Sequence, residues 1–466
     1  MIGNCKFILL ALLGSRLLTL SAYPLMDKTE ARYAEIARIM VSTGNWLTPY
    51  LDVSTPFWGK PPLSFWLSAL SYKCLGVSEF SARLPMFLCT LFTLYLLHRS
   101  SRLLQLRNPY LPLVLYIASP ISYLIAGAVM TDAALMCGVS LSLYAGLMAI
   151  YKPESQLLSS TLLGIGLAVG LLAKGPVTSI FCLGPLVLLT ALSWRSHRRA
   201  PVFNWLLVAV LSAGLSLPWY LAAEQATPGF LRYFLLGEHV YRFLIPGWQG
   251  DLYGSAHRQP PGMIWIFIVL AIAPWILAGL PLRKITAFRR PHLKRPPEAT
   301  VFLLLCTFIP LFFFSLTRNV LVTYIAPSLP ALALLSARAW ECASLQPLDK
   351  LSRNIGLFFA PLILISAIAA LRWGGIVAPS ETALIRALQK SKPGAPIVYE
   401  GSIPFSARFY SHGTVLRSPP RDIRTGQTLA HWLVKRDPYQ TEISINELSA
   451  LSRQHFVYWK APEPAR

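Results

Sequence analysis

The carboxylates with the greatest catalytic potential lie where the chain borders apolar stretches. Asp27 and Glu30 are three residues apart, so they would share one face of a helix. Asp132 stands in a short connection between two apolar stretches, where a carboxylate is costly and therefore suggests a function. Carboxylates placed at a membrane surface together with basic residues suggest a site that handles an anionic lipid headgroup. Alternatively, Asp27 and Asp132 cap helices and Glu30 interacts with a helix dipole.

Several cations and one tyrosine border other apolar stretches. Lys60, between aromatic residues and two prolines, could bind a phosphate, or it could extend toward lipid headgroups. Lys174 joins two apolar stretches, and Arg318 precedes a further stretch in which Tyr324 stands near the start. Such a tyrosine is also typical of the aromatic belt of a membrane protein. These residue types suit the binding of an anionic headgroup.

A further group combines Glu238, His239 and Arg242. Glu238 and Arg242 are four residues apart and would face each other on a helix. His239 could ligate a divalent metal ion together with Glu238, or it could have a structural role as a hydrogen-bond donor. A single histidine is weak evidence for a metal. The sequence therefore leaves the cofactor open.

Composition places these residues in a membrane protein. The 466-residue chain is 54% hydrophobic and 13% charged, which is too apolar for an ordinary soluble protein. Its net charge of +22 would suit a nucleic-acid-binding protein, but the basic residues concentrate in short connections between apolar stretches. They therefore indicate membrane topology, and we expect no nucleic-acid partner.

Eleven apolar stretches are long enough to cross a bilayer as helices. If the chain starts in the cytoplasm, the basic clusters in 99–107, 195–199, 283–295 and 338–353 all fall on the cytoplasmic side, as the positive-inside rule requires. We expect the first stretch to remain as an anchor. The predicted spans are 7–24, 82–98, 111–128, 133–150, 156–173, 176–194, 203–221, 263–282, 300–316, 321–337 and 354–371.

This topology leaves three larger pieces on the opposite side of the membrane. They are the connections 26–81 and 222–262 and the segment 372–466, whereas 1–371 forms the membrane domain. The first connection contains an amphipathic pattern at 29–43, which predicts a helix lying along the membrane surface. A second such helix is expected after the paired prolines of the first connection.

The C-terminal segment has the composition of a soluble domain. Its strand-like stretches at 396–399 and 455–459, with a helix-like stretch at 406–410, predict a small α/β domain. The candidate site residues, although they come from separate segments, all map to this same side of the membrane. A transporter would place such residues near the bilayer midplane, so we favour a site for an anionic lipid headgroup. A flippase or other transporter without chemistry, or a non-catalytic assembly factor, is the alternative.

Three motifs in the first connection resemble one family: PLMDKTEARYAEI at 24–36, GNWLTP at 44–49 and FWGKPP at 57–62. With Thr131-Asp132, Lys174-Gly175, Glu238-His239 and Thr323-Tyr324 following in order, the chain resembles the bacterial relatives of the protein O-mannosyltransferases, which include the lipid A aminoarabinose transferase. The resemblance covers residues 1 to about 340. It implies the GT-C fold, an all-α polytopic membrane protein.

The resemblance also implies a reaction. A sugar, hexose or pentose, would pass from a polyprenyl (undecaprenyl) phosphate donor to a periplasmic acceptor by an inverting displacement at the anomeric carbon. The enzyme would act at the periplasmic face of a bacterial inner membrane. The acceptor class stays open between lipid A, another cell-envelope glycan and protein.

Residue roles follow from the same resemblance. The family's adjacent Asp-Glu pair is Thr29-Glu30 here, with Asp27 two positions earlier, so the base would be either Asp27 or Glu30. Asp132 matches the second acidic position and would help to orient the acceptor. Lys60 and Tyr324 match positions that meet the donor phosphate, and we expect Arg242, Lys174 and Arg318 to bind it with them.

A metal is associated with the histidine position in some relatives of this kind. His239 matches that position, and Glu238 precedes it. However, the glutamate that usually stands before the lysine is Gly59 here, which argues against a bound divalent metal.

Overall fold

The protein is a multi-pass membrane protein. Seven helices among the described residues are long and apolar enough to cross a membrane, and two shorter apolar helices accompany them. The computed structural model describes residues 5–195, 201–245, 248–254, 259–277, 297–317, 319–342, 350–373, 378–418, 429–435 and 455–460.

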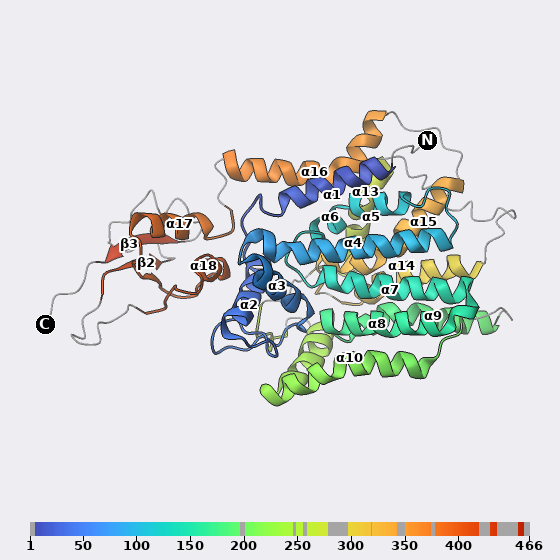
Figure 1. The fold of residues 1–466 in the computed structure, drawn as a ribbon, viewed down its shortest axis with the longest axis horizontal. Coiled ribbons are helices and arrows are strands. Elements are labelled where there is room, and N and C mark those ends of the chain that lie inside the picture. The colour runs from blue at the N-terminus through green and yellow to red at the C-terminus, as the bar shows by residue number, and fades with distance from the viewer. Residues whose placement is uncertain are drawn as a thin grey trace.

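Long helices lie side by side in a bundle (Figure 1). Each predicted span overlaps one of these helices or two consecutive ones, and the end of the span predicted at 263–282 lies outside the described residues. The bundle contains α1 (Cys5–Thr19), α4 (Glu79–Leu103), α5 (Leu111–Ala118), α6 (Pro120–Ile125), α7 (Asp132–Tyr151), α8 (Gln156–Lys174), α9 (Val177–Arg195), α10 (Trp205–Ala226), α13 (Met263–Leu277), α14 (Pro297–Ser315), η4 (Val322–Ser328), α15 (Leu329–Cys342) and α16 (Lys350–Trp373), with the short η1 (Pro153–Ser155) between α7 and α8.

Helix α7 is buried along nearly all of its length, as expected for a helix that is apolar on every side. It approaches α8 very closely: a Cβ atom at Gly138 would lie 2.5 Å from the backbone oxygen of Gly166. Small residues allow this approach between membrane helices. Because α7 and α8 are antiparallel neighbours, the close contact brings the first residue of α7, Asp132, beside the last residue of α8, Lys174.

The span predicted at 111–128 is divided. Ser119 has an extended backbone conformation between α5 and α6, and Pro120 begins the second helix. A residue before proline disfavours the helical conformation, and proline has no N–H group to donate. The chain then runs without helix from 126 to 131 before α7 starts.

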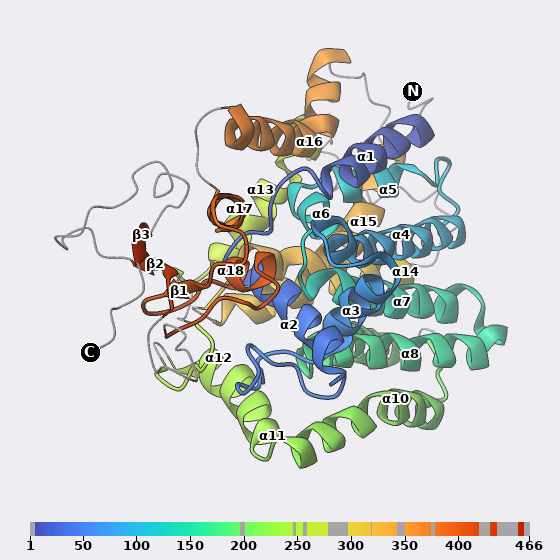
Figure 2. The same cartoon turned by 60° about the vertical axis from the view of Figure 1, so that its left-hand side comes forward.

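Helices α2 (Thr29–Thr43) and α3 (Leu63–Leu75) lie at one end of the bundle (Figures 1 and 2). The predicted helix at 29–43 matches α2. Its apolar face, with Ile36 and Met40, packs with Phe65 and Tyr72 of α3 in one buried cluster. The second large connection forms the short helices α11 (Phe230–Arg232), η2 (Tyr233–Tyr241) and α12 (Arg242–Leu244).

The C-terminal unit is a small α/β domain, as predicted. Strand β2 is central, parallel to β1 and antiparallel to β3. The prediction located β1, β3 and α18 but missed α17 and β2. The elements are α17 (Thr382–Ser391), β1 (Ile397–Tyr399), α18 (Phe405–Tyr410), β2 (His431–Lys435) and β3 (Phe456–Lys460).

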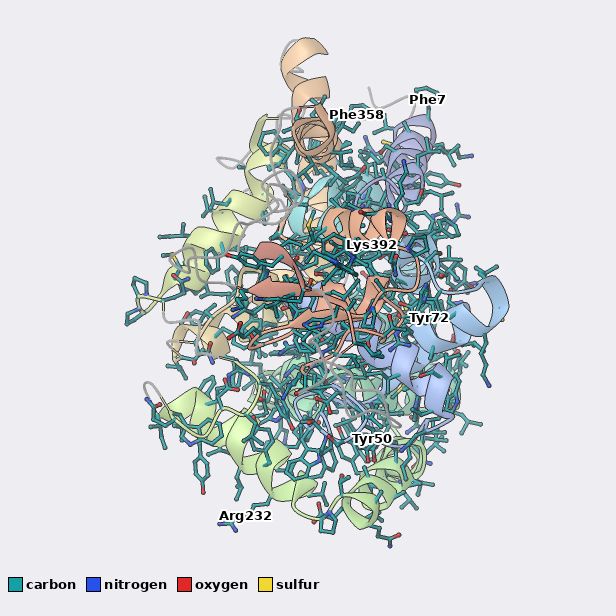
Figure 3. The ribbon with its side chains drawn as sticks, turned by 90° about the vertical axis from the view of Figure 1, so that its left-hand side faces the viewer. Phe7, Tyr50, Tyr72, Arg232, Phe358 and Lys392 are labelled. Carbon is teal, nitrogen blue, oxygen red and sulfur yellow. The ribbon has the colours of Figure 1, made fainter. Side chains whose placement is uncertain are left out.

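This C-terminal domain contacts the end of the bundle through α18. The Tyr410 hydroxyl accepts a hydrogen bond from Leu25 N at 2.8 Å and donates one to Glu79 at 3.0 Å. In the view onto this end, Lys392 of the domain lies near the centre, with Tyr72 and Tyr50 of the first connection lower in the picture (Figure 3). The sequence-distant first connection and C-terminal domain therefore form one surface.

Candidate active site

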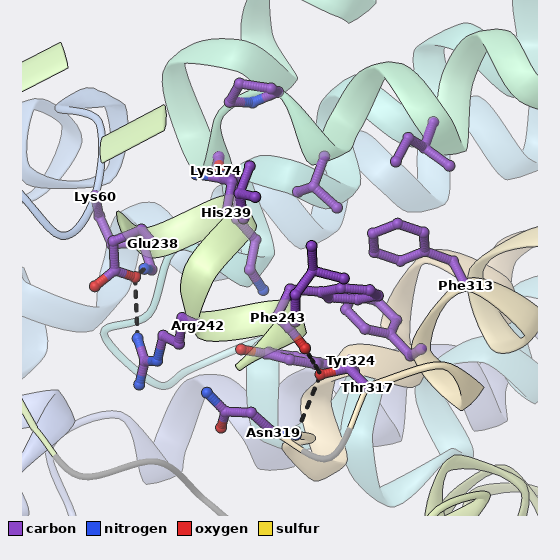
Figure 4. Close-up of a pocket in the computed structure, with 16 residues that line it drawn as sticks. Lys60, Lys174, Glu238, His239, Arg242, Phe243, Phe313, Thr317, Asn319 and Tyr324 are labelled. Carbon is purple, nitrogen blue, oxygen red and sulfur yellow. Dashed lines mark hydrogen bonds and ion pairs between the residues drawn. The ribbon is translucent and has the colours of Figure 1, made fainter. Parts of the chain in front are cut away.

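A cavity of about 330 Å³ lies where the first connection, the second connection and several helix ends converge (Figure 4). It has two kinds of wall, one polar and one apolar. The polar residues are Lys60, Lys174, Glu238, His239, Arg242, Thr317, Asn319 and Tyr324. The apolar residues are Pro176, Val177, Ile180, Val240, Phe243, Leu244, Phe313 and Phe314.

Glu238 organises the cations on the polar wall. Its carboxylate accepts hydrogen bonds from Lys60 Nζ at 3.1 Å, from Arg242 Nη1 at 2.9 Å and from the Tyr233 hydroxyl at 3.1 Å. Arg242 also pairs with Asp251 at 3.2 Å. Burial raises the pKa of the Glu238 carboxyl, but the charges of Lys60 and Arg242 outweigh it and lower that pKa to about 2. The ionised Glu238 thus holds two cations at the cavity.

The second ion pair joins Asp132 and Lys174. Lys174 Nζ lies 2.6 Å from Asp132 Oδ1, and both side chains are mostly buried. The same ammonium group lies 5.1 Å from the centre of the Tyr324 ring, a cation–π distance. Asp132 is therefore linked to the cavity by Lys174, which lines it.

Gly175 allows the chain to turn directly after Lys174. Its φ of +89° lies in the left-handed region, and a Cβ atom there would lie 2.6 Å from the Phe234 ring. His239 packs against this turn, with Nδ1 2.7 Å from Phe234 O and Nε2 3.3 Å from Lys174 O. Burial lowers the pKa of His239, which favours the neutral imidazole.

These contacts do not fit a metal centre formed by Glu238 and His239. The Glu238 carboxylate is engaged by two cations, and both His239 ring nitrogens face carbonyl oxygens. Within the described ranges, no cluster of three or more histidine, cysteine, aspartate or glutamate residues could hold a metal ion. We therefore derive no step through a metal.

The predicted phosphate-binding residues come together, whereas two predicted carboxylates do not join them. Lys60, Lys174, Arg242 and Tyr324 line one cavity, and Arg318 lies outside the described residues. Asp27 instead contacts the C-terminal domain: it accepts hydrogen bonds from the Ser406 backbone N–H at 3.1 Å and from the Ser406 hydroxyl. Burial raises the pKa of the Asp27 carboxyl, and the bonds from Ser406 partly oppose this rise.

Glu30 likewise has its carboxylate engaged away from the cavity, whereas Asp132, also outside the lining, contacts the lining residue Lys174. Glu30 forms a two-pronged ion pair with Arg83, at 2.8 and 2.9 Å. Sequence reasoning missed Arg83, although a cation at the start of a predicted span is itself a signal for a buried partner. It also missed the roles of Tyr233 and Asp251, which no motif marks.

Replacing Glu238 by glutamine is expected to lower the free energy of unfolding by about 3–5 kcal/mol at neutral pH. The reason is that Lys60 and Arg242 lose the buried counter-charge that they share. The folded pKa of about 2 lies below the ordinary value of 4.5, so the ionic contribution is fully present above that value and is lost as pH falls toward about 2. The difference in melting temperature between detergent-solubilised wild-type and variant protein should therefore be clearly smaller at about pH 3 than at pH 7 and should disappear only as the pH approaches about 2. An equal difference at both pH values would contradict this account.

Comparisons with known proteins agree with this fold. The family model of dolichyl-phosphate-mannose-protein mannosyltransferases matches residues 6–234. A relative from Proteus mirabilis, undecaprenyl phosphate-alpha-4-amino-4-deoxy-L-arabinose arabinosyl transferase 2, is 29% identical over 70% of this chain and 58% of its own length. The corresponding transferase of Pseudomonas savastanoi pv. phaseolicola is 30% identical over 71% of this chain and 60% of its own length. The chain thus spans about three-fifths of these curated relatives.

A solved structure is similar along nearly the whole chain. ArnT from Cupriavidus metallidurans bound to undecaprenyl phosphate superposes with a TM-score of 0.76 at 17% identity, covering 97% of both chains. Its apo structure gives a TM-score of 0.73 over the same coverage. These likenesses confirm the predicted GT-C fold. With the sequence matches, they show that the chain has the GT-C fold and is similar to the protein mannosyltransferases over residues 6–234 and to the undecaprenyl phosphate-aminoarabinose arabinosyl transferases over about 70% of its length.

Proposed function

We propose that this protein is an inverting glycosyltransferase that moves a sugar from polyprenyl (undecaprenyl) phosphate to an acceptor at the periplasmic face of a bacterial inner membrane. One observation carries the proposal: a single cavity joins a cationic wall to an apolar wall. A polyprenyl phosphate has the same two parts, an anionic head and a hydrocarbon chain. Lys60, Lys174 and Arg242 would bind the head, and apolar lining residues such as Phe243 and Phe313 would contact the chain.

The reaction needs the leaving phosphate to be stabilised as it departs. The acceptor oxygen forms a bond to the anomeric carbon while the bond from that carbon to the phosphate oxygen breaks. The electron pair stays on the phosphate, which gains negative charge. Cations fixed beforehand stabilise this charge more in the transition state than in the ground state. Glu238 fixes Lys60 and Arg242 for this role, and Asp132 fixes Lys174.

A hydroxyl acceptor must also lose its proton. Of the predicted catalytic carboxylates, Asp132 is the one with a contact to a cavity-lining side chain, Lys174. Asp27 and Glu30 are engaged by Ser406 and Arg83 outside the cavity lining. We therefore place the proton-accepting and acceptor-orienting role on Asp132. The membrane domain, 1–371, would perform the reaction with the C-terminal domain, 372–466, held beside it.

Relatives suggest the first donor to test. Their names specify undecaprenyl phosphate-4-amino-4-deoxy-L-arabinose, and lipid A, another envelope glycan or protein is the acceptor to be distinguished. Purified protein should consume this donor, or another undecaprenyl phosphate sugar of a small panel, and release undecaprenyl phosphate with a glycosylated acceptor detected by mass spectrometry. If undecaprenyl phosphate binds but no donor is consumed with any acceptor, a lipid carrier without chemistry is the better explanation.

A further inference from the structure

The segment that directly precedes Asp132, residues 126–131, has no regular secondary structure. Residues 126–131, between α6 and α7, form turns and bends rather than helix, and most of them are buried. Buried non-helical backbone in a membrane protein needs hydrogen-bond partners from elsewhere in the protein. The position of Asp132 therefore depends on what holds this segment.

Glu30 contacts segment 126–131 through Val129. Its Oε1 atom accepts a hydrogen bond from the backbone N–H of Val129 at 3.3 Å, three residues before Asp132. Its Oε2 atom accepts one from the N–H of Met26 at 3.2 Å. Both oxygens also pair with Arg83, whose side chain is fully buried. The carboxylate thus joins the start of α2 to the segment.

Arg83 anchors this carboxylate to the end of α1. Its guanidinium donates to the carbonyl oxygens of Leu20 at 2.7 Å, Tyr23 at 2.8 Å and Pro24 at 3.0 Å. It also lies 3.8 Å from the centre of the Tyr23 ring. Three separate parts of the chain, 20–30, Arg83 and Val129, therefore meet at one ion pair.

Arg16 also contacts segment 126–131. Its buried guanidinium donates to Leu124 O at 3.2 Å and to the Tyr23 hydroxyl at 3.3 Å. It lies so close to Gly127 that a Cβ atom there would be 2.4 Å from Arg16 Cζ. Arg16 and Arg83 both contact Tyr23, so the residues that contact segment 126–131 are connected to one another.

We infer that Glu30 is a positioning residue: with Arg83 it fixes segment 126–131 and thereby sets Asp132 against Lys174. This inference rests on the proposed function for its kinetic consequence but not for its structural one. A base must reach the acceptor in the cavity. Neither Glu30 nor Asp132 lines the cavity, but Asp132 contacts Lys174, which does. The oxygens of Glu30 are instead occupied by the Val129 and Met26 N–H groups and Arg83.

Two variants distinguish a positioning role of Glu30 from a role as general base, because both lack a base at position 30. Glu30→Ala removes the oxygen that accepts from Val129 and leaves Arg83 without its counter-charge. Glu30→Gln combined with Arg83→Gln keeps an acceptor oxygen at position 30 and removes both charges. A matched control is Glu35→Gln with Arg38→Gln, a buried pair on the same helix with bonds of 2.7 and 2.8 Å.

We would measure kcat as a function of pH with an undecaprenyl phosphate sugar, together with hydrogen exchange of the peptide containing residues 126–131. Glu30→Ala should speed exchange of this peptide about tenfold or more and lower kcat about a hundredfold, the effect of a misplaced group. The combined variant, Glu30→Gln with Arg83→Gln, should keep slow exchange, a kcat within about tenfold of wild type and the acid limb of its pH profile. The control pair should leave exchange of this peptide unchanged.

Three results would overturn the inference. The first is a combined variant with slow exchange but no turnover, which would make Glu30 the base. The second is unchanged exchange in Glu30→Ala. The third is a control pair that speeds exchange of the peptide equally. If Glu30→Ala does not fold, the combined variant decides by itself. If no sugar donor is ever consumed, the proposed function fails, yet the exchange comparison still tests the positioning role.

Discussion

Replacing Asp132 by asparagine is expected to lower kcat about a thousandfold, within the range that loss of a general base produces. Asparagine keeps the size of the side chain but cannot accept the acceptor's proton. It also leaves Lys174, 2.6 Å away, without its counter-charge. The measurement is the rate of undecaprenyl phosphate release from an undecaprenyl phosphate sugar by purified protein.

Stability and turnover must be separated in this experiment. Asp132→Asn with Lys174→Met removes both charges, so it should recover thermal stability without recovering kcat. Glu154→Gln, an exposed carboxylate in η1, serves as the control and should retain wild-type kcat. Asp132→Asn with a kcat within about threefold of wild type would remove Asp132 from the mechanism.

Replacing Lys60 by methionine is expected to lower kcat about a hundredfold or more, the loss typical of one preorganised group that stabilises developing charge. Methionine fills similar space without charge. Glu238 keeps its partner Arg242 at 2.9 Å, so the second connection should retain its fold. The Kd for the donor, an undecaprenyl phosphate sugar, should change less than kcat, because the phosphate gains its extra charge only as the sugar leaves.

Lys73 gives a matched control for this variant. It is an exposed lysine of α3, with its ammonium group 5.0 Å from the Trp46 ring. Lys73→Met removes the same charge from the same connection without touching the cavity and should leave kcat unchanged. Equal losses in both variants would show that general surface charge, rather than the Lys60 contact, affects turnover.

The membrane helices could be predicted well because their signal is local. Apolar runs located the long bundle helices of the described residues, and the resemblance of the motifs indicated the GT-C fold. The division of 111–128 at Pro120 shows the limit of hydropathy, since α5 and α6 are equally apolar on either side of the break. The proline itself was the available signal.

The site was predictable in part. Lys60, Lys174, Arg242 and Tyr324 line one cavity, as their shared side of the membrane suggested. What the sequence could not show is which carboxylate each cation pairs with, because pairing depends on three-dimensional packing. Asp27 and Glu30 stand in the motif of the first connection, yet Ser406 and Arg83, distant in sequence, occupy their oxygens.

The C-terminal domain illustrates the same limit. Strand β2 (His431–Lys435) is short and has no clear alternation, although it pairs with both other strands. Strand β2 could therefore be recognised only from its pairing with β1 and β3 in the structure. Contacts of α18 with Leu25 and Glu79 likewise join parts of the chain that lie far apart in sequence.

The most direct test of the central claim is mass spectrometry of lipid-linked sugars and envelope glycans from three strains. One lacks this protein, one carries the wild type, and one carries Asp132→Asn at equal abundance. We expect one undecaprenyl phosphate sugar to accumulate, and one glycan, lipid A or protein to lose a sugar, in both the deletion and the variant strain. If neither lipid nor acceptor differs from the wild type although the protein is expressed, the claim of sugar transfer is contradicted.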